Sequence, residues 1–186
     1  MTTIEQSSTA TASALRKLYF TRFAFAIVWA AIFAVAASTL NPLSIALLVL
    51  YPVVDLVAAV VDFRTSETAK PTPALFVNMA LSLLAAIGLG IAVASGSSAA
   101  LIVWGAWAIT TGLVQLIVAT TRRALGGQWP MIISGAISTL AGIAFIAMGT
   151  NPEASITGLA GYAVLGGVFF LISALRLGRA AKGQTR

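Results

Sequence analysis

The sequence contains no cysteine and no histidine. Without cysteine there is no disulfide, no iron–sulfur cluster and no thiol nucleophile. Without histidine the chain lacks the commonest proton shuttle and the commonest ligand of transition metals. A phosphate-binding glycine loop, a Ser-His-Asp set and a pair of carboxylates facing a cleft are missing as well. The sequence therefore predicts a protein that is not an enzyme and that holds no cofactor and no metal.

Charge is also scarce. Only 9% of the 186 residues are charged and 59% are hydrophobic, whereas charged residues make up about a quarter of a soluble domain. The net charge of +6 would suggest nucleic acid as the partner of a soluble protein. Membrane proteins, however, gather Lys and Arg at their cytoplasmic edge. We therefore predict an integral membrane protein whose partner is the lipid bilayer and that binds no nucleic acid.

Six apolar stretches follow one another along the chain, each close to the length of about 20 residues that crosses a hydrocarbon core as an α-helix. They cover residues 20–40, 43–63, 74–94, 99–120, 131–149 and 155–175. Short neutral turns join the first stretch to the second, the third to the fourth and the fifth to the sixth. The predicted fold is an all-α membrane protein with six transmembrane helices, its transmembrane domain covering residues 18–178.

The basic residues indicate how the bundle lies in the membrane. All 11 of them fall on one side of the predicted bundle, and the positive-inside rule places that side and both termini in the cytoplasm. Residues 1–17 are polar and rich in Ser, Thr and Ala, so we expect a disordered cytoplasmic tail there. Residues 179–186 are expected to form a basic cytoplasmic tail.

An internal repeat relates three parts of the chain. Asn41-Pro42 recurs as Asn151-Pro152, 110 residues later, and half of that offset falls on the middle turn at residues 96–97. A similar step relates three aromatic residues, the small or polar residues four positions after them, and the bases that follow. These sets are Tyr51, Trp107 and Tyr162; Asp55, Thr111 and Gly166; and Arg64, Arg122 and Arg176. We predict three parallel helical-hairpin repeats, unlike the inverted repeats of many carriers.

Glycine is frequent in the later spans, and in lipid small residues let two helices approach closely. Gly135 and Gly142 lie seven residues apart on one helix face. We expect tight packing within the bundle, with an oligomeric interface as the alternative. The glycines predicted to pack helices are Gly112, Gly135, Gly142, Gly158, Gly161, Gly166 and Gly167.

Two acids lie in the second span, where an ionised Asp at the bilayer centre costs about 2.5–3.5 kcal/mol. Asp62 is two residues from Arg64, and we interpret it as an interfacial residue paired with Arg64 or Arg22. Asp55 lies nine residues before Arg64, about 13 Å further into the membrane at about 1.5 Å per residue. Because Arg22 enters the first span from the same side, we hypothesise that Arg22 meets Asp55.

The role of Asp55 stays open at this point. A structural ion pair is the favoured interpretation, and a proton-responsive site or a transport site are the alternatives. Burial in lipid favours the neutral acid, whereas a nearby arginine favours the carboxylate, so its charge is not decided. Polar residues of other spans could complete an intramembrane site with it: Asn78, Thr110, Thr111 and Gln115.

Spans four to six resemble the HdeD-like family of short-repeat bacterial membrane proteins. The resemblance is carried by "WGAWAITTGLVQLIVATTRR", residues 104–123, and by residues 126–179, which run from "GGQWPMIISGAIS" to "GVFFLISALRLGR". In these stretches a small-residue helix, a turn with Pro, an aromatic residue followed by Gly and a terminal base occur in the family's order. The resemblance implies a six-span protein of the bacterial inner membrane, linked in some members to acid stress, with no established reaction and no catalytic residue.

Three functions are compatible with these features. The leading expectation is a structural or stress-associated membrane protein that acts through a homo-oligomer or a membrane-complex partner. A small proton- or solute-conducting protein that uses Asp55 is the runner-up. The third is an accessory subunit of a larger membrane complex.

Overall fold

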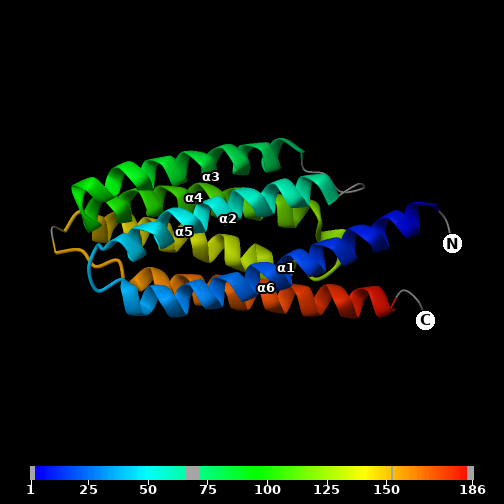
Figure 1. Cartoon of the computed structure of the whole chain (residues 1–186). Helices are drawn as coiled ribbons and strands as arrows, with labels where there is room; N and C mark the ends of the chain where they lie inside the picture. Colours follow the sequence, from blue (N-terminus) through cyan, green and yellow to red (C-terminus); the bar gives the residue numbers. More distant parts are fainter. Residues whose placement is uncertain (1–2, 66–71, 152, 184–186) are drawn as a thin grey trace.

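The computed structural model describes residues 3–65, 72–151 and 153–183, and the regular structure of these residues is helical (Figure 1). The long helices are α1 (Thr3–Ala36), α2 (Pro42–Thr65), α3 (Thr72–Ala92), α4 (Ser97–Thr121), α5 (Trp129–Gly149) and α6 (Gly158–Gly183). Two single 3₁₀ turns, η1 (Val93–Ser95) and η2 (Arg123–Leu125), lie beside the ends of α4.

Each of these six helices contains a stretch that is long and apolar enough to cross a membrane. Large apolar side chains remain exposed on the outside of the bundle, with Val35 84% exposed, Leu84 64% and Ile91 69%. Water does not tolerate an exposed apolar surface that covers a whole bundle, whereas lipid does. The protein is therefore an all-helical integral membrane protein, as the sequence predicted.

The helices form a closed ring in which consecutive helices run in opposite directions and α1 packs against α6 (Figure 1). The start of α1, the end of α2, the start of α3, the α4–α5 connection and the end of α6 lie at one end of the bundle, which we call the terminal end. The opposite end is the far end. The most extensive packing is between α4 and α5, α1 and α6, and α2 and α3. Each of these pairs joins helices of two different predicted hairpins, not the two helices of one hairpin. The three-hairpin repeat stays a prediction.

A seam of small residues holds α4 against α5. Gly105 and Gly112 in α4 face Gly142 and Gly135 in α5, so that small residues recur every seven positions on both helices. A methyl group at Gly105 would lie 2.5 Å from the carbonyl oxygen of Gly142. The backbones can approach this closely only because neither residue has a side chain. The prediction that Gly112, Gly135 and Gly142 pack within the bundle is confirmed.

The glycines of α6 behave differently from the prediction. A methyl group at Gly167 would contact Ala26 of α1 at 3.2 Å, as expected for a packing residue. Gly158, Gly161 and Gly166, however, have no atom within 4 Å of such a methyl group. Gly158 and Gly161 are exposed on the outside of the bundle, and Gly166 lines an internal cavity. The prediction that they pack helices within the bundle is therefore wrong, and the alternative of an oligomeric interface stays a prediction.

The N-terminal segment is helical where disorder was predicted. α1 begins at Thr3, and Leu15 is fully buried in an apolar cluster with Leu177 of α6. The prediction of a disordered tail over residues 1–17 is wrong for the described part, because Ala174 and Leu177 of α6 belong to the apolar cluster that buries Leu15. Residues 1–2 and 184–186 of the two predicted tails lie outside the described residues.

Candidate functional site: a polar cavity inside the bundle

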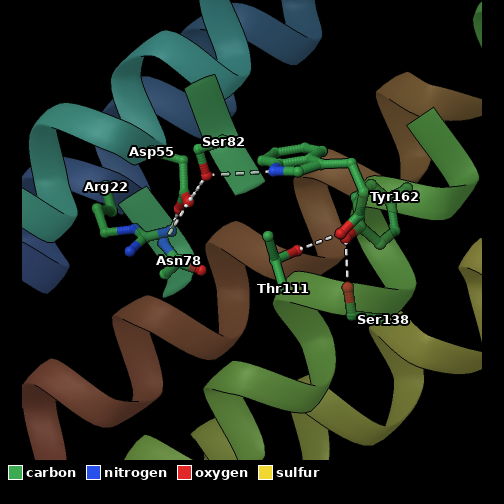
Figure 2. A network of polar contacts seen from close by, with 8 residues as sticks. Arg22, Asp55, Asn78, Ser82, Thr111, Ser138 and Tyr162 are labelled. Atoms are coloured by element: carbon green, nitrogen blue, oxygen red, sulfur yellow. Dashed lines mark hydrogen bonds and ion pairs between the residues drawn. The ribbon is translucent and has the colours of Figure 1, made fainter. Parts of the chain in front are cut away.

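The side chains of Arg22 and Asp55 form an ion pair between α1 and α2 (Figure 2). Asp55 Oδ1 accepts a hydrogen bond from Arg22 Nη2. Asp55 Oδ2 accepts two more from α3, from Asn78 Nδ2 at 2.8 Å and from Ser82 Oγ at 2.8 Å. Asp55 is only 7% exposed, and a buried carboxylate is tolerated when both of its oxygens are hydrogen-bonded to donors. The predicted meeting of Arg22 with Asp55 is confirmed.

Ser82 belongs to this network but was not singled out from the sequence. It follows Asn78 by four residues, and residues four apart lie on the same face of a helix. That spacing could have identified it. Ser82 Oγ also accepts a hydrogen bond of 3.2 Å from Trp107 Nε1 in α4. The carboxylate of Asp55 is thus connected through Ser82 to the indole of Trp107.

Asp62 has a different partner from the predicted one. Its two carboxylate oxygens accept hydrogen bonds of 2.7 and 2.7 Å from the guanidinium of Arg122, the residue that follows the last residue of α4. The side chain of Arg122 is fully buried, and such bidentate pairs are the strong form of this interaction. The predicted pairing with Arg64 or Arg22 is wrong, because residues two apart on a helix do not face each other and Arg22 is engaged by Asp55.

The two ion pairs border a cavity of about 110 Å³ that is lined by side chains from all six helices. For comparison, an engineered apolar cavity of about 150 Å³ in another protein binds benzene. The polar lining residues are Tyr19, Arg22, Tyr51, Asp55, Asp62, Asn78, Thr111, Gln115, Ser134, Ser138 and Tyr162. The predicted neighbours Asn78, Thr111 and Gln115 are therefore brought together with Asp55. Thr110 is not among the residues that line the cavity, and its hydroxyl donates to carbonyl groups of its own helix.

Positions at equal spacing in the sequence line this one cavity. The members of each set lie 55 or 56 residues apart: Arg22, Asn78 and Ser134; Tyr51, Trp107 and Tyr162; Asp55, Thr111 and Gly166. The first and the third of these sets begin with a charged residue, Arg22 and Asp55. Their later members have shorter, uncharged side chains. The space opposite the ion pair is therefore the volume that Ser134 and Gly166 leave unfilled.

An aromatic cluster closes the cavity toward the far end. Tyr51 and Trp107 line the cavity, and the ring centroid of Tyr51 lies 4.8 Å from that of Trp29, 5.4 Å from that of Trp104 and 6.0 Å from that of Trp107. Trp29 and Trp104 are completely buried. The half of the bundle beyond Tyr51 is thus filled by large rings.

The other polar groups near the cavity differ in whether they have a hydrogen-bond partner. Gln115 Nε2 donates to the carbonyl of Met131 at 2.9 Å, and Ser138 is hydrogen-bonded to Tyr162 (Figure 2). The indole nitrogen of Trp104 has no partner among the described residues, and neither has the hydroxyl of Tyr51. Within the same residues, no three acidic side chains come together in a group that could hold a metal ion.

Comparisons with protein families, with curated proteins and with solved structures find no match for this chain. The function of the cavity is therefore inferred from its own geometry and chemistry. Buried side chains with opposite charges, several hydroxyl and amide groups and an open volume can together hold a small polar molecule.

Proposed function

We propose that this integral membrane protein holds a small polar solute in its central cavity and passes it between the two ends of the bundle. The observation that carries the proposal is the cavity of about 110 Å³, which all six helices line and which contains the Arg22–Asp55 pair. Ionisable residues inside a membrane are costly, and they mark solute or ion pathways by default. A bundle built only for stability would fill the same volume with apolar side chains.

The asymmetry of the cavity fits a carrier better than an open channel. Aromatic rings in contact with one another lie beyond Tyr51 toward the far end, where an open channel would need free space. Transport would require these rings to separate while the terminal end closes, which is alternating access around one fixed site. Trp107 takes part in the ring cluster and is connected through Ser82 to Asp55. A solute that displaces Asp55 would therefore change the hydrogen bonds that hold Trp107 in the cluster.

The setting of the protein is part of the proposal. Because the sequence places its bases at the terminal end, we propose that this end faces the cytoplasm, according to the positive-inside rule. The resemblance of residues 104–123 and 126–179 to the HdeD-like family supports a place in the bacterial inner membrane and a link to acid stress. No step of the proposed function breaks or forms a covalent bond, so the protein is proposed not to be an enzyme.

A second candidate is a structural, stress-associated membrane protein or an accessory subunit of a membrane complex. It is favoured by the saturation of both buried carboxylates, since Asp55 accepts three hydrogen bonds and Asp62 accepts two from Arg122. Buried pairs of this kind can fix the register of helices without any ligand. The two candidates differ in one property: a solute site must admit water and small molecules, whereas a structural core excludes them.

Single cysteines test this difference, because the chain has no cysteine of its own and therefore no background. Thr111→Cys places a thiol at the cavity lining. Leu84→Cys is the matched control on the lipid-facing side of α3, where Leu84 is 64% exposed. Each variant is treated in native membranes with a small charged thiosulfonate reagent, applied first from one side and then from the other.

The proposed function predicts that Thr111→Cys is modified from the cytoplasmic side while Leu84→Cys is not, because a charged reagent does not enter lipid. Modification of Thr111→Cys from both sides, at different rates, would fit alternating access. If the thiol of Thr111→Cys reacts from neither side although it is modified after unfolding, the cavity is dry, and the structural candidate is correct.

A further inference from the structure

We infer that the solute held in the cavity is a small monocarboxylate anion. This inference rests on the proposed function and names the class of solute. It follows from the hydrogen-bonding groups that remain unused around the cavity, from the exposure of its charged groups and from the shape of its apolar part.

The acceptor groups of the two cavity acids are already occupied. Asp55 accepts from Arg22, Asn78 and Ser82, and Asp62 accepts two hydrogen bonds from Arg122. A cationic or donor-rich solute would have to displace these bonds before it could bind. The acids of the cavity therefore offer little to an ammonium group.

Donor groups, in contrast, remain unused. A guanidinium carries five N–H donors, and Arg22 uses one nitrogen, Nη2, to bind Asp55. Its remaining donors have no partner among the described residues. The Arg22 side chain is 23% exposed, against 8% for Asp55, and both residues line the cavity. Tyr51 also lines the cavity, and its hydroxyl can donate a further hydrogen bond.

The unused N–H donors of Arg22 favour a solute that carries a negatively charged hydrogen-bond acceptor. A guanidinium and a carboxylate match each other in a planar, two-bond geometry, and charge-assisted hydrogen bonds are about twice as strong as neutral ones. The ring of Phe170 lies under the guanidinium at 4.2 Å from its centroid and holds it in place from one face. The structure shows one hydrogen-bonding nitrogen of Arg22 in use, Nη2, which binds Asp55.

The rest of the cavity fits a short apolar body. Apolar side chains of all six helices contribute to the lining, among them Leu75, Val114, Ile137, Leu165 and Phe169. A volume somewhat below that of a cavity of about 150 Å³, which holds benzene, leaves room for a carboxylate with a chain of few carbons. At the terminal end, the exposed bases Arg64 and Arg123 raise the local concentration of anions.

Three probes of nearly the same size and different charge test the class of the solute. Propionate is the anion, propionamide is its neutral analogue and propylammonium is a cation. Binding of each to the purified protein in lipid nanodiscs is measured by isothermal titration calorimetry at neutral pH. We expect propionate to bind at least about tenfold more tightly than propionamide and propylammonium, because only propionate can accept charge-assisted hydrogen bonds from Arg22.

Variants assign the binding to the proposed groups. Arg22→Gln should weaken propionate binding at least about tenfold, while Arg179→Gln, an equal change at an exposed residue of α6, should leave it within about twofold. Tyr51→Phe removes only a hydroxyl without a described partner, so it should preserve the fold and weaken binding severalfold. Asp55→Asn should strengthen propionate binding severalfold, because it removes the negative charge that competes with propionate for Arg22.

Each other outcome overturns the inference. Tighter binding of propylammonium or propionamide would show a cavity for another class of solute. Loss of propionate binding in Asp55→Asn, with normal thermal stability, would show that Asp55 is the binding group. If none of the three probes binds, the monocarboxylate inference is wrong, and the labelling of Thr111→Cys then decides separately whether the cavity holds a solute at all.

Discussion

Two glycine-to-alanine substitutions should have opposite effects on stability. At Gly142, the new methyl group would lie 2.5 Å from the carbonyl oxygen of Gly105 and 2.8 Å from the backbone nitrogen of Ile109. An ordinary carbon–oxygen contact is about 3.3 Å, so α4 and α5 would have to separate by about 0.8 Å at this point. Overpacking of this kind costs about 1–3 kcal/mol. Because the neighbouring atoms are backbone atoms, a rotamer change of a side chain cannot relieve it.

Gly161→Ala is the matched control. The same methyl group meets nothing within 4 Å at that position, and alanine in a helix is favoured over glycine by about 0.5–1 kcal/mol. The thermal unfolding midpoint of each purified variant in detergent measures the difference. At about 2–4 °C per kcal/mol for a chain of this size, Gly142→Ala should unfold roughly 2–12 °C below the parent protein. Gly161→Ala should unfold at the same temperature or slightly above it. Equal midpoints for Gly142→Ala and the parent protein would refute the close approach of α4 and α5.

Two further predictions concern other parts of the bundle. Asp62→Asn should destabilise the protein by about 3–5 kcal/mol, because it leaves the buried guanidinium of Arg122 without its carboxylate. Arg64→Gln, a change at an exposed residue two positions from Asp62, should have little effect. Equal melting temperatures for the two variants would contradict this. Leu15→Ala should lower the free energy of unfolding by about 2–5 kcal/mol, because Leu15 is fully buried and the substitution leaves its site empty. Denaturant unfolding measures the change. An unchanged free energy of unfolding would instead support the disordered tail that the sequence predicts.

The sequence predicts those features that depend on distance along a helix. The number of spans follows from the length of the apolar stretches, which the thickness of the membrane determines. The Arg22–Asp55 pair could be inferred because helical rise places both residues at a similar depth. Gly135 and Gly142 could be assigned to one face because their spacing of seven residues is close to two helical turns.

Features that depend on which way a helix faces are harder to predict. These helices are apolar on nearly all sides, so the pattern does not show which side of α6 faces lipid, and Gly158 and Gly161 were assigned to the wrong side. The partner of Asp62 depends on where the bundle places Arg122, 60 residues away in the sequence, and sequence distance does not reveal this. Helix formation before the first span depends equally on tertiary structure, because Leu15 is buried in a cluster that includes Ala119, Met131 and Leu177 from other helices.

The sequence does not predict the cavity, although it identifies several of the polar residues that line it. The sequence shows that three polar residues lie within the spans, namely Asp55, Asn78 and Gln115. It does not show whether open space remains between their side chains. That space exists because Ser134 and Gly166 are short where the equally spaced positions in the first part of the chain carry Arg22 and Asp55. Only the packing of all six helices together shows the volume.

The most direct test of a polar, solute-holding cavity is its content in an electron cryo-microscopy map of the protein in lipid nanodiscs. The account predicts density for ordered water or a bound small molecule between the guanidinium of Arg22 and the side chains of Tyr51 and Gln115. A bundle in which Phe170 or Tyr51 fills this volume, leaving Arg22 and Asp55 in a dry contact, would contradict it.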